Sequence, residues 1–526
     1  MAFLLHHLLS ESAARYPDRE AIAFKDRLIT YAELERESNK LAHTLISFRI
    51  AKGDRVGLFL DRGIESIIAA CGVLKTGATY VPIDPGSPLR RVIYIIEKCG
   101  IRLLLTNNDK LPKIKTAFPE NSPLEHIVLM DGNESSPVGL LGTTQLINGY
   151  LVPDELGESA PVVKVIDSDI AYILFTSGST GNPKGVMLSH LNSLTFVNSS
   201  CDFFGIEKED RLSNIAPLHF DMSVFDIFVA FKAGACVVAI PEITAIFPAK
   251  LVEYISEKKI TIWNSVPSAL SLLATNKNLN TCDLSSLRLI LFAGELFPLK
   301  YLRLLQEAIP GARFCNMYGQ TEANSSTYYW VDQLPSDGRG ILPIGRALPN
   351  FEVFAIDENG NRVQGSEQEG ELYVRASTVA LGYWGDIEKT KKSFVRNPLQ
   401  PDLPEIVYKT GDLVRLDSDG NYVFLGRKDH MIKSRGYRIE IGEIETVLCN
   451  HPEIKNAVVI PIPDELIGNR LSVIVVPMTP GKLTKEDVYR HCFSQLPKYM
   501  IPEIVEFRDS VPTTSSGKVD RQKLKG

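Results

Sequence analysis

The chain has no long apolar run, no paired cysteines and no excess of basic charge. No stretch of eighteen apolar residues occurs in its 526 residues, which excludes a membrane-spanning helix on length. The apolar segment 1–10 lacks a basic start and a cleavage site, and charged residues follow it directly. We therefore expect an amphipathic first helix, a cytoplasmic protein and no association with a membrane.

Several other classes of protein are disfavoured by what is missing. The eight cysteines form no Cys-x-x-Cys pair and have no histidines at metal-ligand spacing, so they are expected to be reduced and mostly buried. A formal net charge of −6, without a basic stripe interleaved with aromatic residues, argues against nucleic acid as a partner. Internal repeats and low-complexity tracts are not visible, which disfavours a solenoid or scaffold.

The length and the patterning predict more than one domain. A chain of this length is too long for one core, and alternating strand and helix patterns through most of it predict an α/β fold. Short strands with Asp-Gly turns begin near Glu352, and a smaller α+β pattern begins after Arg427. We expect a core at residues 1–428, β-rich at about 350–428, and a small domain at 429–526, with the boundary between Arg427 and His430.

The most informative segment is residues 175–186, which read Phe-Thr-Ser-Gly-Ser-Thr-Gly-Asn-Pro-Lys-Gly-Val. Its backbone N–H groups, hydroxyls and single ammonium are suited to surround a phosphate. A predicted strand at 171–175 precedes it and helical spacing begins at His190, so we expect a strand, loop and helix at the carboxyl edge of a sheet. The alternative, a flexible surface linker, is disfavoured by the buried strand and by Pro183-Lys184. The order of a Walker A loop is absent.

This loop resembles the phosphate loop of the adenylate-forming superfamily, which contains acyl-CoA synthetases, firefly luciferases and the adenylation domains of nonribosomal peptide synthetases. Further matching segments follow in the family's order at residues 74–84, 316–322, 370–374, 408–412, 426–436 and 516–518. The resemblance covers nearly the whole chain and is closest to amino-acid adenylation domains. It implies a large N-terminal domain of αβαβα layers with a β-rich subdomain, and a small, mobile α+β C-terminal lid domain.

The resemblance implies a reaction in which a carboxylate attacks the α-phosphate of ATP in the presence of Mg²⁺. Because two anions must meet, the site has to supply cations and a metal. Glu322 is the implied magnesium ligand and Thr321 the implied α-phosphate contact. The implied phosphate contacts are Thr176, Ser177, Gly178, Ser179, Thr180, Gly181 and Lys184. The implied adenine contacts are Asn316 and Tyr318, and the implied ribose contacts are Asp412 and Arg427. Taken alone, residues 408–412 would be interpreted as a plain turn.

The resemblance also implies a second half-reaction. Lys518 lies in a Thr-, Ser- and Gly-rich tail, where a lone lysine is usually solvated, but by resemblance it reaches the substrate carboxylate during adenylation. The lid domain then rotates about Asp429, and Lys433 and Gly436 line a tunnel for an incoming thiol. Since no carrier segment follows Gly526, the expected acceptor is a phosphopantetheinyl carrier protein supplied in trans.

Asp221 matches the aspartate with which amino-acid adenylation domains pair the substrate ammonium. The alternative is a helix cap through the amides of Ser223 and Val224. The other implied pocket positions are uncharged: Met222, Phe225, Asn264, Leu291, Ala293, Met317, Ser325 and Ser326. They predict a compact neutral amino acid, L-proline first, with small α-amino acids and β-amino acids as alternatives.

The sequence departs from the commonest family pattern at Gln320 and Asp226, where proline and glutamate are usual. Two competing functions remain open at this point. An acyl-CoA ligase would not need Asp221. A catalytically silent nucleotide-binding protein is disfavoured because Lys184, Glu322, Asp412 and Lys518 are all present.

Overall fold

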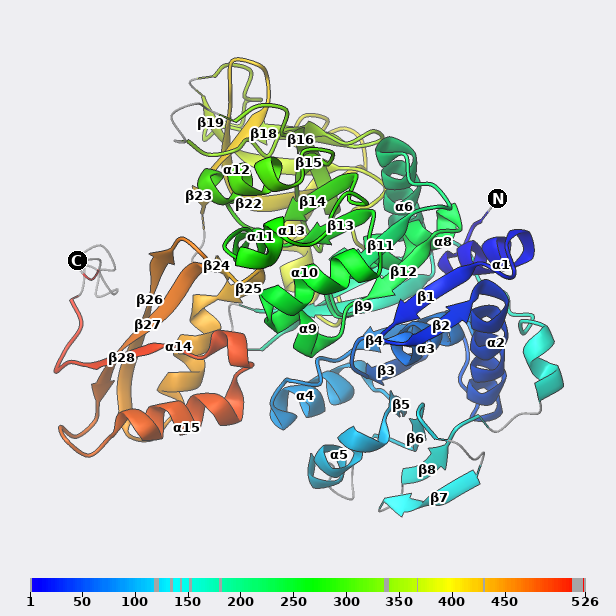
Figure 1. Ribbon diagram of the computed structural model, residues 1–526. Helices are drawn as coiled ribbons and strands as arrows, with labels where there is room; N and C mark the ends of the chain where they lie inside the picture. The colour runs from blue at the N-terminus through cyan, green and yellow to red at the C-terminus, as the bar shows by residue number, and fades with distance from the viewer. Residues whose placement is uncertain are drawn as a thin grey trace.

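Two large mixed sheets dominate the described part of the chain (Figure 1). The computed structural model describes residues 2–117, 123–132, 136–141, 144–150, 154–178, 182–334, 340–366, 368–428, 431–512 and 524. The first sheet has the order β17 (Arg346–Ala347), β16 (Asn324–Trp330), β15 (Arg313–Gln320), β14 (Leu289–Ala293), β13 (Ile262–Ser265), β11 (Arg211–Asn214), β12 (Cys236–Ala239), β1 (Glu20–Phe24) and β2 (Arg27–Thr30).

The second large sheet contains the strand that leads into the glycine-rich loop. Its order is β20 (Gly382–Tyr383), β10 (Lys184–Ser189), β9 (Ile170–Thr176), β4 (Thr79–Pro82), β3 (Arg55–Phe59), β5 (Leu103–Thr106), β6 (His126–Leu129), β8 (Thr144–Asn148) and β7 (Ser136–Leu141). Strands β9, β4, β3, β5, β6 and β8 run parallel, whereas β10 pairs with β9 antiparallel.

Helices cover both faces of each large sheet, which gives alternating helix and sheet layers. One apolar core lies between the sheets and includes residues of α1 (Leu5–Arg15), α2 (Tyr31–Ser47), α3 (Ile64–Lys75), α6 (His190–Phe204) and α8 (Ala230–Ala233). A second core joins the first sheet to α10 (Pro248–Glu257), α11 (Pro267–Ala274) and α12 (Leu299–Ala308). A third joins the second sheet to α4 (Leu89–Cys99) and α5 (Leu111–Ala117). The predicted α/β class with αβαβα layers is confirmed.

A smaller β-rich part follows the first large sheet. It is built from β18 (Glu352–Ile356), β19 (Glu369–Arg375), β21 (Phe394–Arg396), β22 (Ile406–Leu416) and β23 (Tyr422–Arg427). The Asp-Gly turns expected from the sequence lie at the ends of two of these strands, where the Asp357 and Asp417 side chains accept hydrogen bonds from the turn amides. Helix α13 (Ile387–Ser393) packs beside this sheet.

The C-terminal part has a core of its own, drawn in orange and red in Figure 1. A hairpin of β24 (Met431–Ser434) and β25 (Tyr437–Glu440) leads into α14 (Ile441–Cys449), and β26 (Ile454–Asp464), β27 (Gly468–Pro477) and β28 (Ile504–Phe507) form a sheet. Helix α15 (Lys485–Gln495) begins with the expected capping box between Thr484 and Asp487. We call residues 431–512 the small unit.

Local sequence signals account for several other boundaries. The i, i+3, i+4, i+7 apolar spacing of residues 64–71 lies inside α3, where it is buried between the sheets. The apolar N-terminal segment contributes α1, whose Leu5, Leu8 and Leu9 are buried while other positions face solvent, as expected of an amphipathic helix. Among the described helices, none combines the length and apolar character that crossing a bilayer requires.

Candidate active site

The glycine-rich loop joins two strands, which differs from the expected strand, loop and helix. Strand β9 ends at Thr176, the chain enters β10 at Lys184, and α6 begins only at His190. The helix expected from His190 is confirmed as α6, but strand β10, which lies between it and the loop, was not predicted. Residues 184–189 form a short, mostly buried strand whose apolar run is too brief to be separated from the start of a helix by periodicity. Ser179, Thr180 and Gly181 lie outside the described residues.

The described donors of this loop are arranged for an anion. The hydroxyl of Thr176 is buried and has no hydrogen-bond partner among the described residues. The Ser177 hydroxyl donates to the carbonyl of Arg438 at 2.7 Å, and the Gly178 amide donates to Glu443 Oε2 at 3.1 Å. A β-carbon at residue 178 would collide with the carbonyl oxygen of Asn182, so the loop can close only with glycine there.

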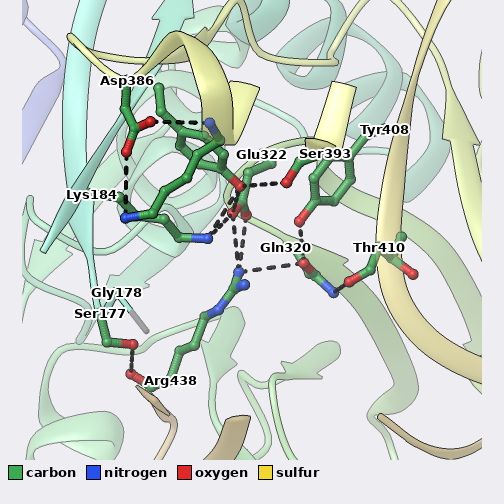
Figure 2. A network of polar contacts seen from close by, with 12 residues as sticks. Ser177, Gly178, Lys184, Gln320, Glu322, Asp386, Ser393, Tyr408, Thr410 and Arg438 are labelled. Atoms are coloured by element: carbon green, nitrogen blue, oxygen red, sulfur yellow. Dashed lines mark hydrogen bonds and ion pairs between the residues drawn. The ribbon is translucent and has the colours of Figure 1, made fainter. Parts of the chain in front are cut away.

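Glu322 is the centre of the polar network in Figure 2 and is fully buried. Lys184 Nζ lies 3.0 Å from Oε1, and the hydroxyl of Tyr383 donates to the same oxygen at 2.8 Å. From the small unit, Arg438 donates to Oε2 at 3.0 Å and to Oε1 at 3.3 Å. A carboxylate thus meets two cations that come from separate parts of the chain.

The charges of this network set the protonation of its members. Burial opposes ionisation of Glu322, but the guanidinium of Arg438 and the ammonium of Lys184 outweigh it and hold the pKa of Glu322 well below its usual range. The pKa of Lys184 is lowered, because burial and the nearby Arg438 outweigh the attraction of Glu322. Glu322 therefore stays ionised and able to bind a hard cation at neutral pH.

A cavity of about 600 Å³ lies beside this network and brings the expected nucleotide contacts together. It is lined by Asn316, Tyr318, Asp412 and Arg427, among others. Asp412 accepts a hydrogen bond from the hydroxyl of Tyr318 and pairs with Arg427 at 2.5 Å. The Asn316 amide nitrogen donates to the carbonyl of Pro343 at 2.9 Å, which leaves its oxygen as an acceptor for an exocyclic amine.

A second, smaller cavity brings together most of the expected substrate contacts. Its lining comprises Phe196, Asp221, Met222, Phe225, Asn264, Ala293, Met317, Asn324 and Ser325. Leu291 and Ser326 are fully buried and do not line it. Thr321 and Glu322 both act electrostatically on the carboxyl group of Asp221, so the cavity adjoins the Glu322 network.

Asp221 does not cap the short helix α7 (Met222–Val224). The amides of Ser223 and Val224 donate to the main-chain carbonyls of Phe220 and Asp221, and the Asp221 side chain makes no cap bond to this helix. Burial raises the pKa of Asp221, against the polar side chain of Thr321 and the charge of Lys433. The half-buried carboxyl group of Asp221, which does not cap α7, is suited to bind a cation.

The hairpin of the small unit is docked against the large part. Lys433 lines the 600 Å³ cavity, and the Gly436 amide donates to Glu295 Oε1 at 2.5 Å. A β-carbon at Gly436, which has a φ of 80°, would collide with the Val266 side chain. Asp429 and Lys518, the expected hinge and adenylation lysine, lie outside the described residues.

Three side chains of this site were not predicted from the sequence. Tyr383 and Arg438 contact Glu322, and Glu443 accepts from Gly178 while pairing with Arg91 at 2.7 Å. The available signal was position: Tyr383 follows Gly382 within the β-rich stretch, and Arg438 lies two residues beyond the matching segment 426–436. Neither position indicates a partner so distant along the chain.

Family comparison agrees with this geometry. The model of the AMP-binding enzyme family matches residues 9–384, and that of the AMP-binding enzyme C-terminal domain matches residues 443–518. The chain therefore belongs to the AMP-binding enzymes, as the sequence predicted, and use of ATP follows from that membership.

The chain is also similar to individual proteins and solved structures. The chain is 36% identical over 519 residues to an L-proline--[L-prolyl-carrier protein] ligase of Pseudomonas fluorescens, covering 98% of each. It is 34% identical to bacitracin synthase 1 of Bacillus licheniformis, of which it spans 9% while 99% of this chain is covered. A solved structure of NpsA-ThdA, an artificially fused adenylation-PCP di-domain nonribosomal peptide synthetase from Klebsiella oxytoca, is 25% identical, with a TM-score of 0.77 over 96% of this chain and 93% of that one.

Proposed function

We propose that this protein activates a small neutral amino acid, L-proline first, as an aminoacyl-adenylate with release of pyrophosphate, and then transfers it to the phosphopantetheine thiol of a carrier protein. The observation that carries the proposal is Asp221, a carboxyl group with no helix to cap at the wall of an otherwise uncharged cavity. The names of the Pseudomonas ligase and of the adenylation-PCP fusion support the amino acid and the carrier protein.

The residues present fit ATP with Mg²⁺. Thr176 offers a buried hydroxyl that no described residue pairs with, and Lys184 offers a cation at the same loop. No group of three or more His, Cys, Asp or Glu side chains suited to a metal occurs among the described residues, which is compatible with Mg²⁺ held by Glu322 and by phosphate oxygens. When bound, Mg²⁺ would neutralise charge that develops on the phosphates.

Side chains of the protein would bind the amino acid, the ribose and the adenine. Asp221 would hold the substrate ammonium, and Thr321, whose side chain acts on Asp221, would contact the α-phosphate. Asp412 and Arg427 would hold the ribose, and Asn316 would accept from the adenine amine. In this arrangement Arg438 and Glu443 of the small unit contact Glu322 and Gly178, so the triphosphate has to arrive with the small unit in another position.

The proposal is tested by ATP–pyrophosphate exchange with a panel of amino acids and simple carboxylic acids. We expect exchange to be fastest with L-proline and dependent on an α-amino or imino group. Exchange that ignores this group, together with turnover that requires coenzyme A, would instead favour an acyl-CoA ligase. Absence of exchange with every acid would favour a silent nucleotide-binding protein.

Asp221→Ala is expected to lower amino-acid-dependent exchange by about 100-fold or more, because a buried substrate ammonium loses its counter-charge. The initial exchange rate over a range of amino-acid concentrations measures the effect. Asp202→Ala, at an exposed position of α6, is the matched control and should exchange like the unaltered protein. Full activity of Asp221→Ala would contradict an amino-acid substrate.

Gly436→Ala is expected to slow transfer to the carrier protein about tenfold or more while exchange stays within about twofold, because the added carbon pushes the hairpin away from Val266. Single-turnover loading of a carrier protein from preformed adenylate measures transfer. Gly481→Ala is the control, since residue 481 has a similar φ of 77° but open space around it. Equal loss of both half-reactions would argue against a role of the hairpin in transfer.

A further inference from the structure

A second carboxyl group lies beneath the substrate cavity and is not used by the proposed reaction. Asp226 belongs to the π-helical turn Phe225–Val229 and is 0% exposed. Its Oδ1 accepts from Asn264 Nδ2 at 2.8 Å, and its Oδ2 accepts from Asn214 Nδ2 at 3.1 Å. Within the described residues it has no ion pair, so a fully buried carboxyl group is held by two side-chain amides alone.

A hydrogen bond to a main-chain carbonyl fixes the direction of the Asn214 amide, whereas the direction of the Asn264 amide depends on Asp226. Asn214 Nδ2 also donates to the main-chain carbonyl of Ala216 at 2.8 Å. A carbonyl can only accept, so Asn214 must turn its NH₂ group toward Asp226. Asn264 likewise spends an N–H on Asp226, which turns its Oδ1 away from that carboxyl group. Because Asn264 lines the same cavity as Asp221, its Oδ1 becomes an acceptor for a ligand there.

We propose that Asp226 is a positioning residue that holds the Asn264 amide with Oδ1 toward the cavity, so that Asn264 and Asp221 form a two-acceptor seat for a substrate ammonium. The inference deepens the proposed function and rests on it. A secondary ammonium, as in an imino acid, has two N–H donors, which these two oriented acceptors match. Asp226 itself does not touch the substrate and acts through Asn264.

Protonation of Asp226 would reverse the orientation of the Asn264 amide in the cavity. Burial raises the pKa of Asp226 to about 8, against the bonds from Asn264 and Asn214 and the charge of Arg62, which lies between β3 and α3. Strands β11 and β13 present neutral amides to it, and α6 packs phenyl rings against the neighbouring Phe225. A protonated Asp226 donates to Asn264 Oδ1 and turns the NH₂ group into the cavity, where it faces the ammonium. Affinity for the amino acid therefore rises with pH as Asp226 ionises.

Asp226→Asn keeps the shape of the side chain and tests the orientation. With Asn214 still donating, the new amide donates to Asn264 Oδ1 and turns the NH₂ group of Asn264 into the cavity. In ATP–pyrophosphate exchange with L-proline, we expect KM to rise about tenfold or more with kcat within about threefold. The rise of kcat/KM between about pH 7 and 9 should disappear. Thermal unfolding checks that the variant is folded.

A double-mutant cycle separates positioning from a general structural effect. Asn264→Ala and the double variant Asp226→Asn/Asn264→Ala are measured in the same assay. If Asp226 acts through Asn264, Asp226→Asn should raise KM little further in a protein that already carries Asn264→Ala. An unchanged KM in Asp226→Asn, a full additional loss in the double variant, or the same pH rise in Asp226→Asn would each overturn the proposal. Failure of the proposed function looks different, because the unaltered protein would then show no exchange with any amino acid.

Discussion

Replacing Glu322 by glutamine is expected to lower amino-acid-dependent ATP–pyrophosphate exchange by about 100-fold or more, because an amide cannot take the charge that this position supplies. The ionised carboxylate is held against Lys184 and Arg438 with no exposed surface. Glutamine would leave the two cations without their shared counter-charge and would be a poor ligand for a hard cation. The initial rate of exchange, measured over a range of Mg²⁺ concentrations, reports the effect.

Two further measurements assign that loss to charge. Tyr383→Phe removes one hydrogen bond to the same oxygen without changing charge, and it should reduce exchange far less than Glu322→Gln. The pKa of Glu322 is depressed in the fold, so its ion pairs stabilise the protein at neutral pH, and this stabilisation is lost as pH falls below the usual range of a glutamate. Glu322→Gln should flatten that acid dependence in thermal unfolding. Near-normal exchange by Glu322→Gln would refute its role as the metal ligand.

The fold was largely predictable because buried strands and helices leave apolar runs or periodically spaced apolar residues in the sequence. The apolar run at 171–175 lies in the buried strand β9, and the helical spacing at 64–71 lies in α3, which is buried at nearly every position. Strand β10 was not predicted because it is short and mostly buried on both faces. Its sequence therefore shows no alternation of apolar and polar residues. It pairs antiparallel with β9, with Lys184 opposite Thr176, and this pairing is a tertiary contact that the local sequence pattern does not predict.

The candidate site was predictable where neighbours in sequence are neighbours in space. Asn316 and Tyr318 lie on one strand, β15, and Asp412 and Arg427 face each other across the β22–β23 pairing. The partners of Glu322 are different, because Tyr383 and Arg438 reach it from 61 and 116 positions away. A single tyrosine or arginine could pair with many residues of a chain of this length, and only the folded structure shows which one it contacts.

The position of the small unit could not be predicted from sequence. Arg438 on β25 lies against Glu322, and Glu443 on α14 receives the Gly178 amide, so the small unit occupies contacts that a triphosphate would otherwise make. The sequence implies two positions for this unit but does not rank their free energies. That difference depends on sums of small interface terms, such as the Arg91–Glu443 ion pair and the edge-to-face contact between Phe220 and Tyr437.

Lys518→Ala is expected to abolish aminoacyl-adenylate formation, with a fall in exchange of about 100-fold or more, while transfer from preformed adenylate to the carrier protein continues. By resemblance Lys518 neutralises the substrate carboxylate as it approaches the α-phosphate, so its charge is needed only in the first half-reaction. Exchange and single-turnover transfer are measured on the same preparation. Lys485→Ala, at an exposed position of α15 in the small unit, is the control for lost charge.

Lys518→Ala and Gly436→Ala should then be mirror images. The first impairs adenylation and spares transfer, whereas the second impairs transfer and spares adenylation, because Gly436 belongs to the hairpin docked against Val266 and Glu295. A protein whose small unit held one fixed position would show both losses together, since one site would serve both reactions. Near-normal exchange by Lys518→Ala would remove the lysine from the chemistry, and parallel losses in both variants would remove the alternation between two positions.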